Sequence, residues 1–199
     1  MALATWRSIL ANAPEHVAEA VAALSYIDPT QPYGTELFEQ LVHLTVSACY
    51  ETVLFRRNDY GKIEVFLSER KANEAYAGEL HSPGFYLRPG KTVKEALLGD
   101  GETPPEKLAG VKQFGAKIID FCHLGTYLFP ERRGTLNGNV VAVTIDGGPD
   151  ENLGSWYPVD ELPEHTIWHH KIFLPKVARV WAGEVLPELF DIEPEPIAL

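Results

Sequence analysis

The stretch Leu80-His81-Ser82-Pro83-Gly84-Phe85-Tyr86-Leu87-Arg88-Pro89-Gly90-Lys91-Thr92-Val93-Lys94-Glu95-Ala96-Leu97 decides the fold of this chain. It begins as a short apolar strand and continues into a segment rich in proline and glycine, which is typical of a turn. The residues that follow predict a helix from about 92 to 98. The stretch therefore predicts a strand, a turn and the beginning of a helix.

The residues before this stretch predict a β-hairpin. Residues 51–57 read as one strand, and residues 62–70 alternate apolar and polar side chains with a period of two, as strands do. The turn sequence Asn58-Asp59-Tyr60-Gly61 stands between them.

The residues after the stretch alternate between helix and strand patterns. Residues 99–105 interrupt the first helix, and residues 105–114 predict a second short helix that ends at Gly115. Strands are predicted at 116–121, 125–129 and 139–145, a polar loop at 131–138, and a last helix at 167–182. We therefore predict a mixed sheet between helices, in which these residues are buried: Val53, Phe55, Val65, Leu67, Ile118, Val141 and Val143.

The first 48 residues predict helices at 2–24 and at about 36–48, the second of which Thr35 can cap. Their apolar residues need a partner surface to be stable in water, so we expect them to pack on the rest of the chain or on a second copy, which would make a homodimer. These residues include Leu10, Val17, Leu37, Leu41 and Leu44. The predicted division is a helical extension at 1–48, an α/β domain at 49–185 and a tail at 186–199, with residues 185–190 helping to cover the same surface.

The composition excludes some classes of partner. Lys and Arg number 17 and Asp and Glu number 28, so the formal net charge is −11. A chain this acidic is poorly suited to neutralise the phosphates of nucleic acid or of an anionic membrane. The sequence contains no apolar run of about 18 residues and no signal-peptide pattern at its start, so we expect a cytoplasmic protein. Cys49 and Cys122 lie in apolar runs and are expected to be buried, reduced thiols.

The deciding stretch resembles the front half of the signature of the Nudix hydrolases, a superfamily that cleaves nucleoside diphosphates linked to some other group. Six of its residues match that signature in register: Pro83, Gly84, Gly90, Thr92, Ala96 and Leu97. Residues 156–163 also resemble a late Nudix segment, Trp-x-Pro-x-Asp-Glu-Leu-Pro. The resemblance covers about residues 50–182 and implies an α/β/α sandwich of Nudix type with a mixed sheet.

The resemblance implies chemistry for which this sequence lacks the usual residues. Phe85 stands where the family's signature has a glycine, and Lys91 stands where it has its first glutamate. The family binds Mg²⁺ or Mn²⁺ on glutamates of one helix, written Arg-Glu-hydrophobic-x-Glu-Glu-x-Gly, and hydrolyses a pyrophosphate there.

That helix has three possible placements. Counted without a gap, Gly99 and Asp100 stand at the arginine and the first glutamate, and Thr103-Pro104 stands at the glutamate pair, where a proline would break the helix. If residues 99–105 are an insertion, which we prefer, the helix is 109–115, Gly110 stands at the first glutamate and Gln113-Phe114 at the pair. Counted from Gly-Glu-Thr-Pro at 101–104, residues 110–111 replace Arg-Glu. None of these placements supplies a carboxylate cluster, so no metal site and no cofactor are expected.

Two sets of charged residues remain as candidates. Asp100, Glu102 and Glu106 either hold a metal ion in a rearranged way or form an exposed acidic loop. A second set of cations lies near the predicted strand ends and could line an anion-binding cleft: Arg56, Arg70, His81, Arg88 and Lys91.

Three functions are compatible with these observations. The first is a Nudix-type protein that has lost the metal-binding glutamates and binds a nucleoside-diphosphate-type or other anionic small molecule, with weak activity or none. The second is a divergent, Mg²⁺-dependent pyrophosphohydrolase that uses the displaced acids. The third is a structural homodimeric module with a vestigial cleft.

Overall fold

The computed structural model describes residues 15–27, 34, 36–37, 41, 47–72, 74–87, 90–131, 134–185 and 189–191. The chain divides into two compact units, Met1–Phe38 and Glu39–Leu199. In the first unit, helix α2 spans Glu15–Leu24, within the predicted helix 2–24. Residues 36, 37 and 41 are helical, but the predicted second helix does not reach 48, because strand β1 begins at Ser47. The expectations for Leu10, Leu44 and the Thr35 cap concern residues outside the described part.

The second unit contains a mixed five-stranded sheet in the order β5-β1-β7-β6-β9. Strand β1 runs parallel to β7, and β6 runs parallel to β9, whereas β5 and the long β6–β7 pair are antiparallel. The bounds of these strands are Gly84–Tyr86 for β5, Ser47–Val53 for β1, Gly134–Ile145 for β7, Ile118–Glu131 for β6 and Leu189–Asp191 for β9.

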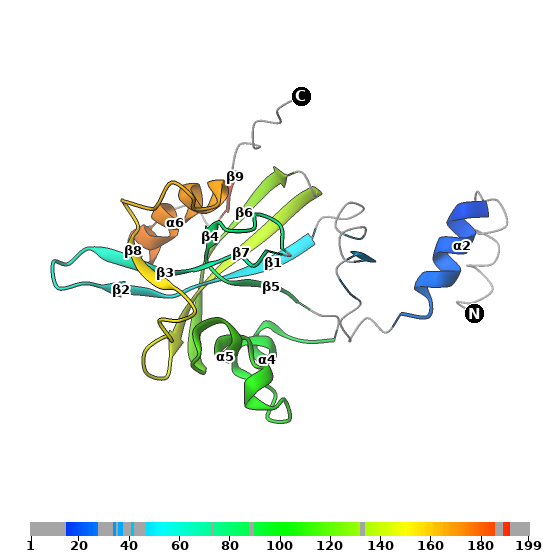
Figure 1. Ribbon diagram of the computed structural model, residues 1–199, viewed down its shortest axis with the longest axis horizontal. Coiled ribbons are helices and arrows are strands. Elements are labelled where there is room, and N and C mark those ends of the chain that lie inside the picture. Colours follow the sequence, from blue (N-terminus) through cyan, green and yellow to red (C-terminus); the bar gives the residue numbers. More distant parts are fainter. Residues whose placement is uncertain are drawn as a thin grey trace. The chain divides into compact units, whose positions relative to one another are not determined.

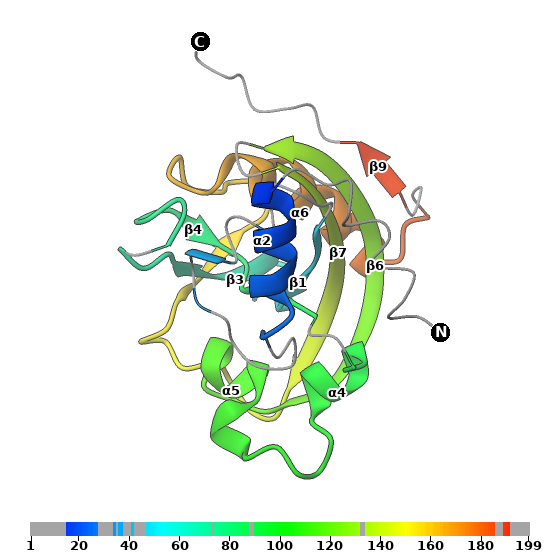
Figure 2. The same cartoon turned by 90° about the vertical axis from the view of Figure 1, so that its right-hand side faces the viewer.

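A second sheet joins β2 (Phe55–Arg57), β3 (Ile63–Glu69) and β4 (Leu80–His81), and β8 (Ser155–Pro158) pairs with β3. Helices α4 (Val93–Leu98) and α5 (Ala109–Phe114), joined through the 3-10 turn η1 (Pro105–Lys107), lie on one side of the strands. Helix α6 (Trp168–Trp181) lies on the other side (Figures 1 and 2). The predicted α/β fold with a mixed sheet between helices is confirmed.

The deciding stretch forms a strand at its start and a helix at its end, as predicted, but its middle, residues 84–86, forms a strand where a turn was predicted. It forms β4, β5 and then α4, whose N-cap residue is Thr92. The Thr92 hydroxyl accepts a hydrogen bond from the Glu95 backbone N–H at 3.2 Å, and the Glu95 carboxylate accepts from the Thr92 N–H at 2.7 Å. This reciprocal pair is a capping box, which satisfies two N–H groups that a helix start otherwise leaves unpaired. Helix α5 ends, as predicted, at Gly115 in the left-handed conformation.

The core lies between α4, α5 and the central strands. The side chains of Phe66, Leu97 and Phe114 are fully buried there. All seven residues predicted to be buried are buried, which confirms the two-residue alternation in these strands. Burying one such apolar side chain stabilises the fold by roughly 1.5–3 kcal/mol.

Three predicted boundaries were wrong. Residues 51–57 are two strands, because the chain leaves the first sheet after Val53 and enters the second at Phe55. The predicted strands at 116–121 and 125–129 are parts of one strand, β6 (Ile118–Glu131), in which the predicted break is a register shift between His123 and Gly125, as in a β-bulge. The predicted polar loop at 131–138 is largely the start of β7. There, a Cβ added at Gly138 would overlap the Tyr127 ring on β6, so the missing side chain makes this close pairing possible.

The two cysteines differ. Both are free thiols, and Cys49 is buried as expected, but Cys122 is exposed on β6, so the prediction of burial was wrong for it. Partial burial, with a contribution from Asp120, raises the pKa of the Cys122 thiol. Among the described residues, no helix is both long and apolar enough to cross a membrane.

Candidate functional site

The segment that resembles the Nudix signature meets α5 through one side chain, Gln113. The Gln113 amide Nε2 donates a hydrogen bond to the Gly84 carbonyl oxygen at 3.3 Å. The Gln113 Oε1 lies 2.9 Å from the Thr52 hydroxyl, which also lies 2.6 Å from the Pro83 carbonyl oxygen. A neutral amide thus links α5 to β1 and to the Pro83-Gly84 turn.

The other two box positions of the preferred placement cannot carry metal ligands. Phe114 is fully buried in the core against Phe66. A Cβ added at Gly110 would stand 2.6 Å from Ile118 Cγ1 and 2.8 Å from the Ala116 carbonyl oxygen, so a glutamate has no room there. Of the three box positions, only Gln113 presents a polar side chain to the turn.

The displaced acids do not form a cluster. Asp100 pairs with Lys91 at 2.7 Å and also accepts hydrogen bonds from the backbone N–H groups of Glu102 and Thr103. The Lys91 hydrogen bond is the main cause that holds the pKa of Asp100 well below its usual range, and the same contact raises the pKa of Lys91. Glu102 and Glu106 are exposed. Among the residues that the structure describes, no three His, Cys, Asp or Glu side chains gather as a possible metal site.

The candidate cations are divided between the two ends of β3. Arg56 pairs with Glu64 at 2.6 Å, near the start of β3, whereas Arg70 follows the last residue of that strand. Six residues of extended chain separate Glu64 from Arg70, or about 20 Å. Lys91 lies in the loop before α4, and Arg88 is outside the described residues. The structure therefore does not bring Arg56 together with Arg70.

Arg70 and His81 do lie together, next to α6. Burial is the main cause that lowers the pKa of His81 to about 3, and the charge of Arg70 contributes. The ring of His81 is centred 6.2 Å from that of His170 on α6. Burial also lowers the pKa of His170 well below its ordinary value, with smaller contributions from His169, His81 and Arg70. Both His81 and His170 are therefore neutral at pH 7.

A buried polar network connects this group to β1. The Ser82 backbone N–H donates to His170 Nδ1 at 3.1 Å, and the Ser82 hydroxyl lies 3.3 Å from the same nitrogen and 3.5 Å from Glu51 Oε2. Ser82 and His170 are fully buried and Glu51 is 7% exposed. A substrate cannot reach the Ser82 hydroxyl, so this Ser-His-Glu arrangement joins elements rather than supplying a nucleophile.

Several buried polar atoms around this network have no hydrogen-bond partner among the described residues. They come from the end of β3, from β4 and from the start of α6: Arg70 Nε, His81 Nδ1, Thr166 Oγ1, Trp168 Nε1 and His170 Nε2. Buried polar groups are nearly always hydrogen-bonded, and buried water is their usual partner where no protein atom reaches them. The Leu80–Thr166 bridge holds the two sides of this region together.

Sequence reasoning missed Thr52, Glu51, Ser82 and His170 as members of this site. The available signal was a run of polar residues inside otherwise apolar strands, and a His-His pair at the start of the last helix. That pair could not be connected to Ser82 without the fold, because 88 positions separate Ser82 from His170.

The fold can be compared with solved structures. No family model and no curated protein sequence matches this chain. The NUDIX domain of Shewanella oneidensis NrtR, solved in complex with ADP ribose, is similar at 14% identity over 81% of this chain and 97% of that one, with a TM-score of 0.50. A NUDIX hydrolase from Nitrosomonas europaea is similar at 14% identity over 72% and 93% of the two chains, with a TM-score of 0.51.

A third similar structure is the complex between the C-terminal domain of mouse MUTYH and human PCNA. The match has 16% identity, covers 71% of this chain and 92% of that one, and has a TM-score of 0.50. At these identities the comparisons establish architecture and not activity. These similarities, together with the mixed sheet between helices, show that this chain has the Nudix fold.

Proposed function

We propose that this chain binds an anionic small molecule of the nucleoside-diphosphate type without a metal ion and does not hydrolyse it at a useful rate. The observation that carries the proposal is a hydrogen bond, which the Gln113 side-chain amide N–H donates to the Gly84 carbonyl oxygen. Mg²⁺ prefers an octahedral shell of oxygens that is usually anchored by carboxylates. An amide nitrogen at that carbonyl supports a site held together by hydrogen bonds and not by metal.

The surroundings of Gln113 support the same proposal. A glutamate cannot fit at Gly110, and Phe114 belongs to the core. Lys91 places a positive charge in the preceding loop, where it is already paired with Asp100. The residues present therefore do not fit the metal ions that the Nudix resemblance implies, and we assign no metal-dependent step to this chain.

The region around Arg70, His81 and Trp168 is our candidate for the ligand cleft. Arg70 can give charge-assisted hydrogen bonds to a phosphate, and its side chain is 23% exposed. The NrtR NUDIX domain, which shares this fold, was solved with ADP ribose, so ADP-ribose is a suitable first probe.

The hydrolase hypothesis would need Asp100, Glu102 and Glu106 to turn toward the box. Asp100 is tied to Lys91 and to two backbone N–H groups, so no observation favours this rearrangement. The extension at 1–48, the domain at 49–185, the tail at 186–199 and a homodimer remain predictions.

Calorimetric titration with ADP-ribose, in EDTA and again in Mg²⁺, tests the proposal, with product analysis of the same samples. We expect saturable binding that is equal in the two buffers, about tenfold weaker binding by Arg70→Gln, and no cleavage. Binding or cleavage that requires metal and is lost in Glu102→Gln or Glu106→Gln would overturn the proposal and restore the hydrolase hypothesis.

A further inference from the structure

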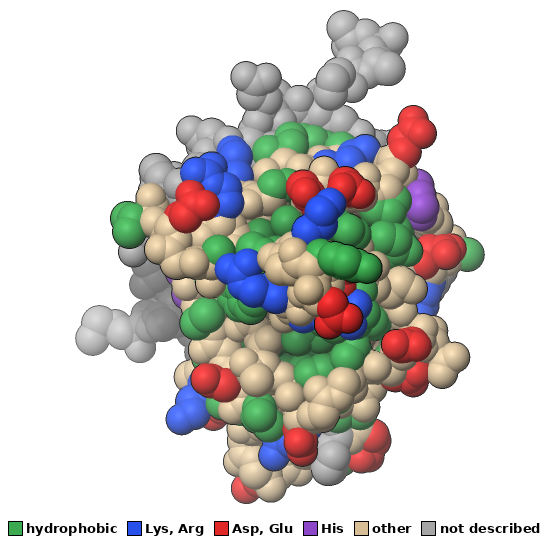
Figure 3. All heavy atoms as spheres, turned by 90° about the vertical axis from the view of Figure 1, so that its left-hand side faces the viewer, with side chains coloured by type: hydrophobic (Ala, Val, Ile, Leu, Met, Phe, Trp, Pro, Cys, Tyr) green, Lys and Arg blue, Asp and Glu red, His purple; other side chains and the backbone are tan. Residues whose placement is uncertain are grey.

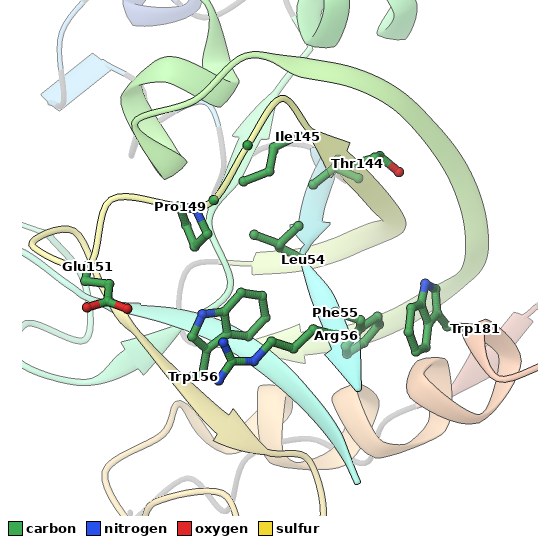
Figure 4. A pocket seen from close by; sticks show the side chains of 12 residues that line it. Leu54, Phe55, Arg56, Thr144, Ile145, Pro149, Glu151, Trp156 and Trp181 are labelled. Atoms are coloured by element: carbon green, nitrogen blue, oxygen red, sulfur yellow. The ribbon is translucent and has the colours of Figure 1, made fainter. Parts of the chain in front are cut away.

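A pocket of about 470 Å³ lies at the other end of β3, away from Arg70 and His81. Leu54 and Ile145 form an apolar floor, and Trp156 and Trp181 stand at its walls (Figure 4). Val143 also lines the pocket. This volume falls in the range of small-molecule sites. The face of the domain that carries the tip of the β2–β3 hairpin shows hydrophobic side chains gathered among charged ones (Figure 3).

One cation in this pocket is held in a fixed orientation. The Arg56 guanidinium lies 4.2 Å from the centre of the Trp156 ring, and its Nε donates to Glu64 Oε2 at 2.6 Å. Asn58 donates to the other oxygen of Glu64 at 3.1 Å, and the Arg56 hydrogen bond, followed by that of Asn58, lowers the pKa of Glu64. Stacking on Trp156 and the Nε hydrogen bond fix the guanidinium plane. Arg56 therefore loses little conformational entropy when an anion binds to its two terminal nitrogens.

Those terminal nitrogens are available. Among the described residues, the Arg56 side chain makes its one ion pair through Nε, and it is 47% exposed. Figure 4 draws Glu151 and Trp181 at opposite ends of the view, with Trp156 and Arg56 between them. The pocket therefore combines indole rings, an apolar floor, one oriented cation and one acceptor.

This combination matches one class of ligand. We propose that the pocket binds a planar aromatic anion. The ring of the ligand packs with the tryptophan side chains on one side and the apolar floor on the other, and the carboxylate or phosphate of the ligand accepts hydrogen bonds from Arg56. Glu151 can accept a hydrogen bond from a ring N–H at the other end. The site is separate from the turn that Gln113 contacts, and the proposal stands whether or not the chain proves to be a hydrolase.

The loop that closes the pocket also contacts α5. Asp150 donates its backbone N–H to the Phe114 carbonyl oxygen at 2.8 Å, and a Cβ added at Gly115 would come within 2.6 Å of Asp150 Cβ. The neighbouring residues Pro149 and Glu151 line the pocket. This packing fixes one wall of the site against a helix, which pre-organises it for a ligand.

The test uses the indole N–H signals of the full-length ¹⁵N-labelled protein in NMR spectra, assigned by single Trp→Phe variants. The probes are AMP and indole-3-acetate, which combine a flat ring with an anion, and adenosine and inorganic phosphate, which each supply one half. We expect saturable shifts of the Trp156 and Trp181 signals with AMP or indole-3-acetate, and binding about tenfold weaker for adenosine and phosphate.

Matched variants locate the effect. Arg56→Gln and Trp181→Leu should each weaken binding about tenfold, whereas Arg70→Gln, at the opposite end of β3, should leave the Trp156 and Trp181 shifts unchanged. An unaltered Trp168 signal in the variants checks that the fold is intact, and Trp181→Leu decides the matter if Arg56→Gln fails to fold. The absence of saturable shifts up to about 5 mM overturns the proposal. Shifts centred on Trp168 and lost in Arg70→Gln also overturn it, and they would instead support the cleft of the proposed function.

Discussion

The Gln113 side chain donates a hydrogen bond to the Gly84 carbonyl oxygen, and its Oε1 accepts a hydrogen bond from the Thr52 hydroxyl. The first of these contacts defines the site: an N–H group is directed at the Pro-Gly turn from the helix that, by resemblance, would carry metal-binding glutamates. The contact also ties α5 to β1 and β5, so its removal should be felt in stability as well as in chemistry.

We predict that Gln113→Glu destabilises the fold more than its near-identical size suggests. The carboxylate keeps an acceptor for Thr52 but loses the donor to Gly84, so two oxygens face each other at a cost of about 1–3 kcal/mol. The introduced carboxyl should have a raised pKa, so the loss should be small below pH 4 and grow as pH rises through that pKa.

Urea unfolding of Gln113→Glu at pH 4 and pH 7, beside Gln113→Ala, measures this effect. Gln113→Ala should cost a similar amount at both pH values, because it introduces no ionisable group. Equal stability of Gln113→Glu and the unchanged protein at pH 7 would show that the Gly84 hydrogen bond is not made.

We predict a pH dependence of stability that His81 causes. Its pKa is about 3 in the folded protein and about 6.5 when unfolded, so between these values the unfolded chain binds more protons. Stability due to neutral His81 is therefore fully present above pH 6.5 and falls as pH decreases, by at most about 1.4 kcal/mol per pH unit.

Chemical denaturation at half-unit steps from pH 7 to pH 4 checks the role of His81. His81→Gln cannot be protonated, so its curve should fall less steeply than that of the unchanged protein. Parallel curves for the two proteins would assign the pH dependence to other groups, among which the buried His170 is the first to examine by His170→Gln.

We predict that His170→Ala costs more than 2 kcal/mol of unfolding free energy, whereas Ser82→Ala costs about 1 kcal/mol or less. His170→Ala opens a cavity in the core and leaves the Ser82 N–H without its acceptor. Ser82→Ala removes two long hydroxyl contacts and keeps that N–H bond. Guanidinium unfolding of both variants gives the comparison, and the reverse order of the two losses would contradict the network described above.

How far the sequence predicts this fold depends on whether a signal is local. The turn at 58–61, the start of α4 near residue 92 and the end of α5 at Gly115 depend on local signals, and the sequence predicts each of them. The extension of β7 through the polar residues 134–138 was not predicted, because it depends on the Tyr127 ring packing over Gly138 from another strand. The end of β1 at Val53 likewise depends on which sheet each segment joins.

The candidate site likewise combines features that residue types alone predict with features that depend on the fold. The lack of carboxylates at 110, 113 and 114 could be predicted, because it follows from residue types alone. The grouping of Arg56 with Arg70 could not be sustained, because β3 holds them about 20 Å apart. The contact of Ser82 with His170 needs the docking of α6 on β4, for which the sequence carries no local signal.

A matched pair of glycine substitutions tests the β6–β7 pairing. Gly138→Ala places a Cβ into the Tyr127 ring and should destabilise the protein by about 1–3 kcal/mol, whereas Gly148→Ala meets no atom within 4 Å and should change stability by less than about 0.5 kcal/mol. Thermal unfolding of both variants measures the difference. A tolerated Gly138→Ala would place these two strands in a different register.

The central claim is that the Pro83-Gly84 turn and α5 form a metal-free site, and titration of the ¹⁵N-labelled protein with Mn²⁺ tests it most directly. Mn²⁺ broadens the NMR signals of nuclei near its binding site and substitutes for Mg²⁺ at oxygen ligands. We predict no selective broadening of the Gly84 backbone and Gln113 side-chain amide signals up to about 1 mM Mn²⁺, a concentration that would fill even a weak site. Selective, saturable broadening of these two signals, reversed by Mg²⁺, would contradict the account.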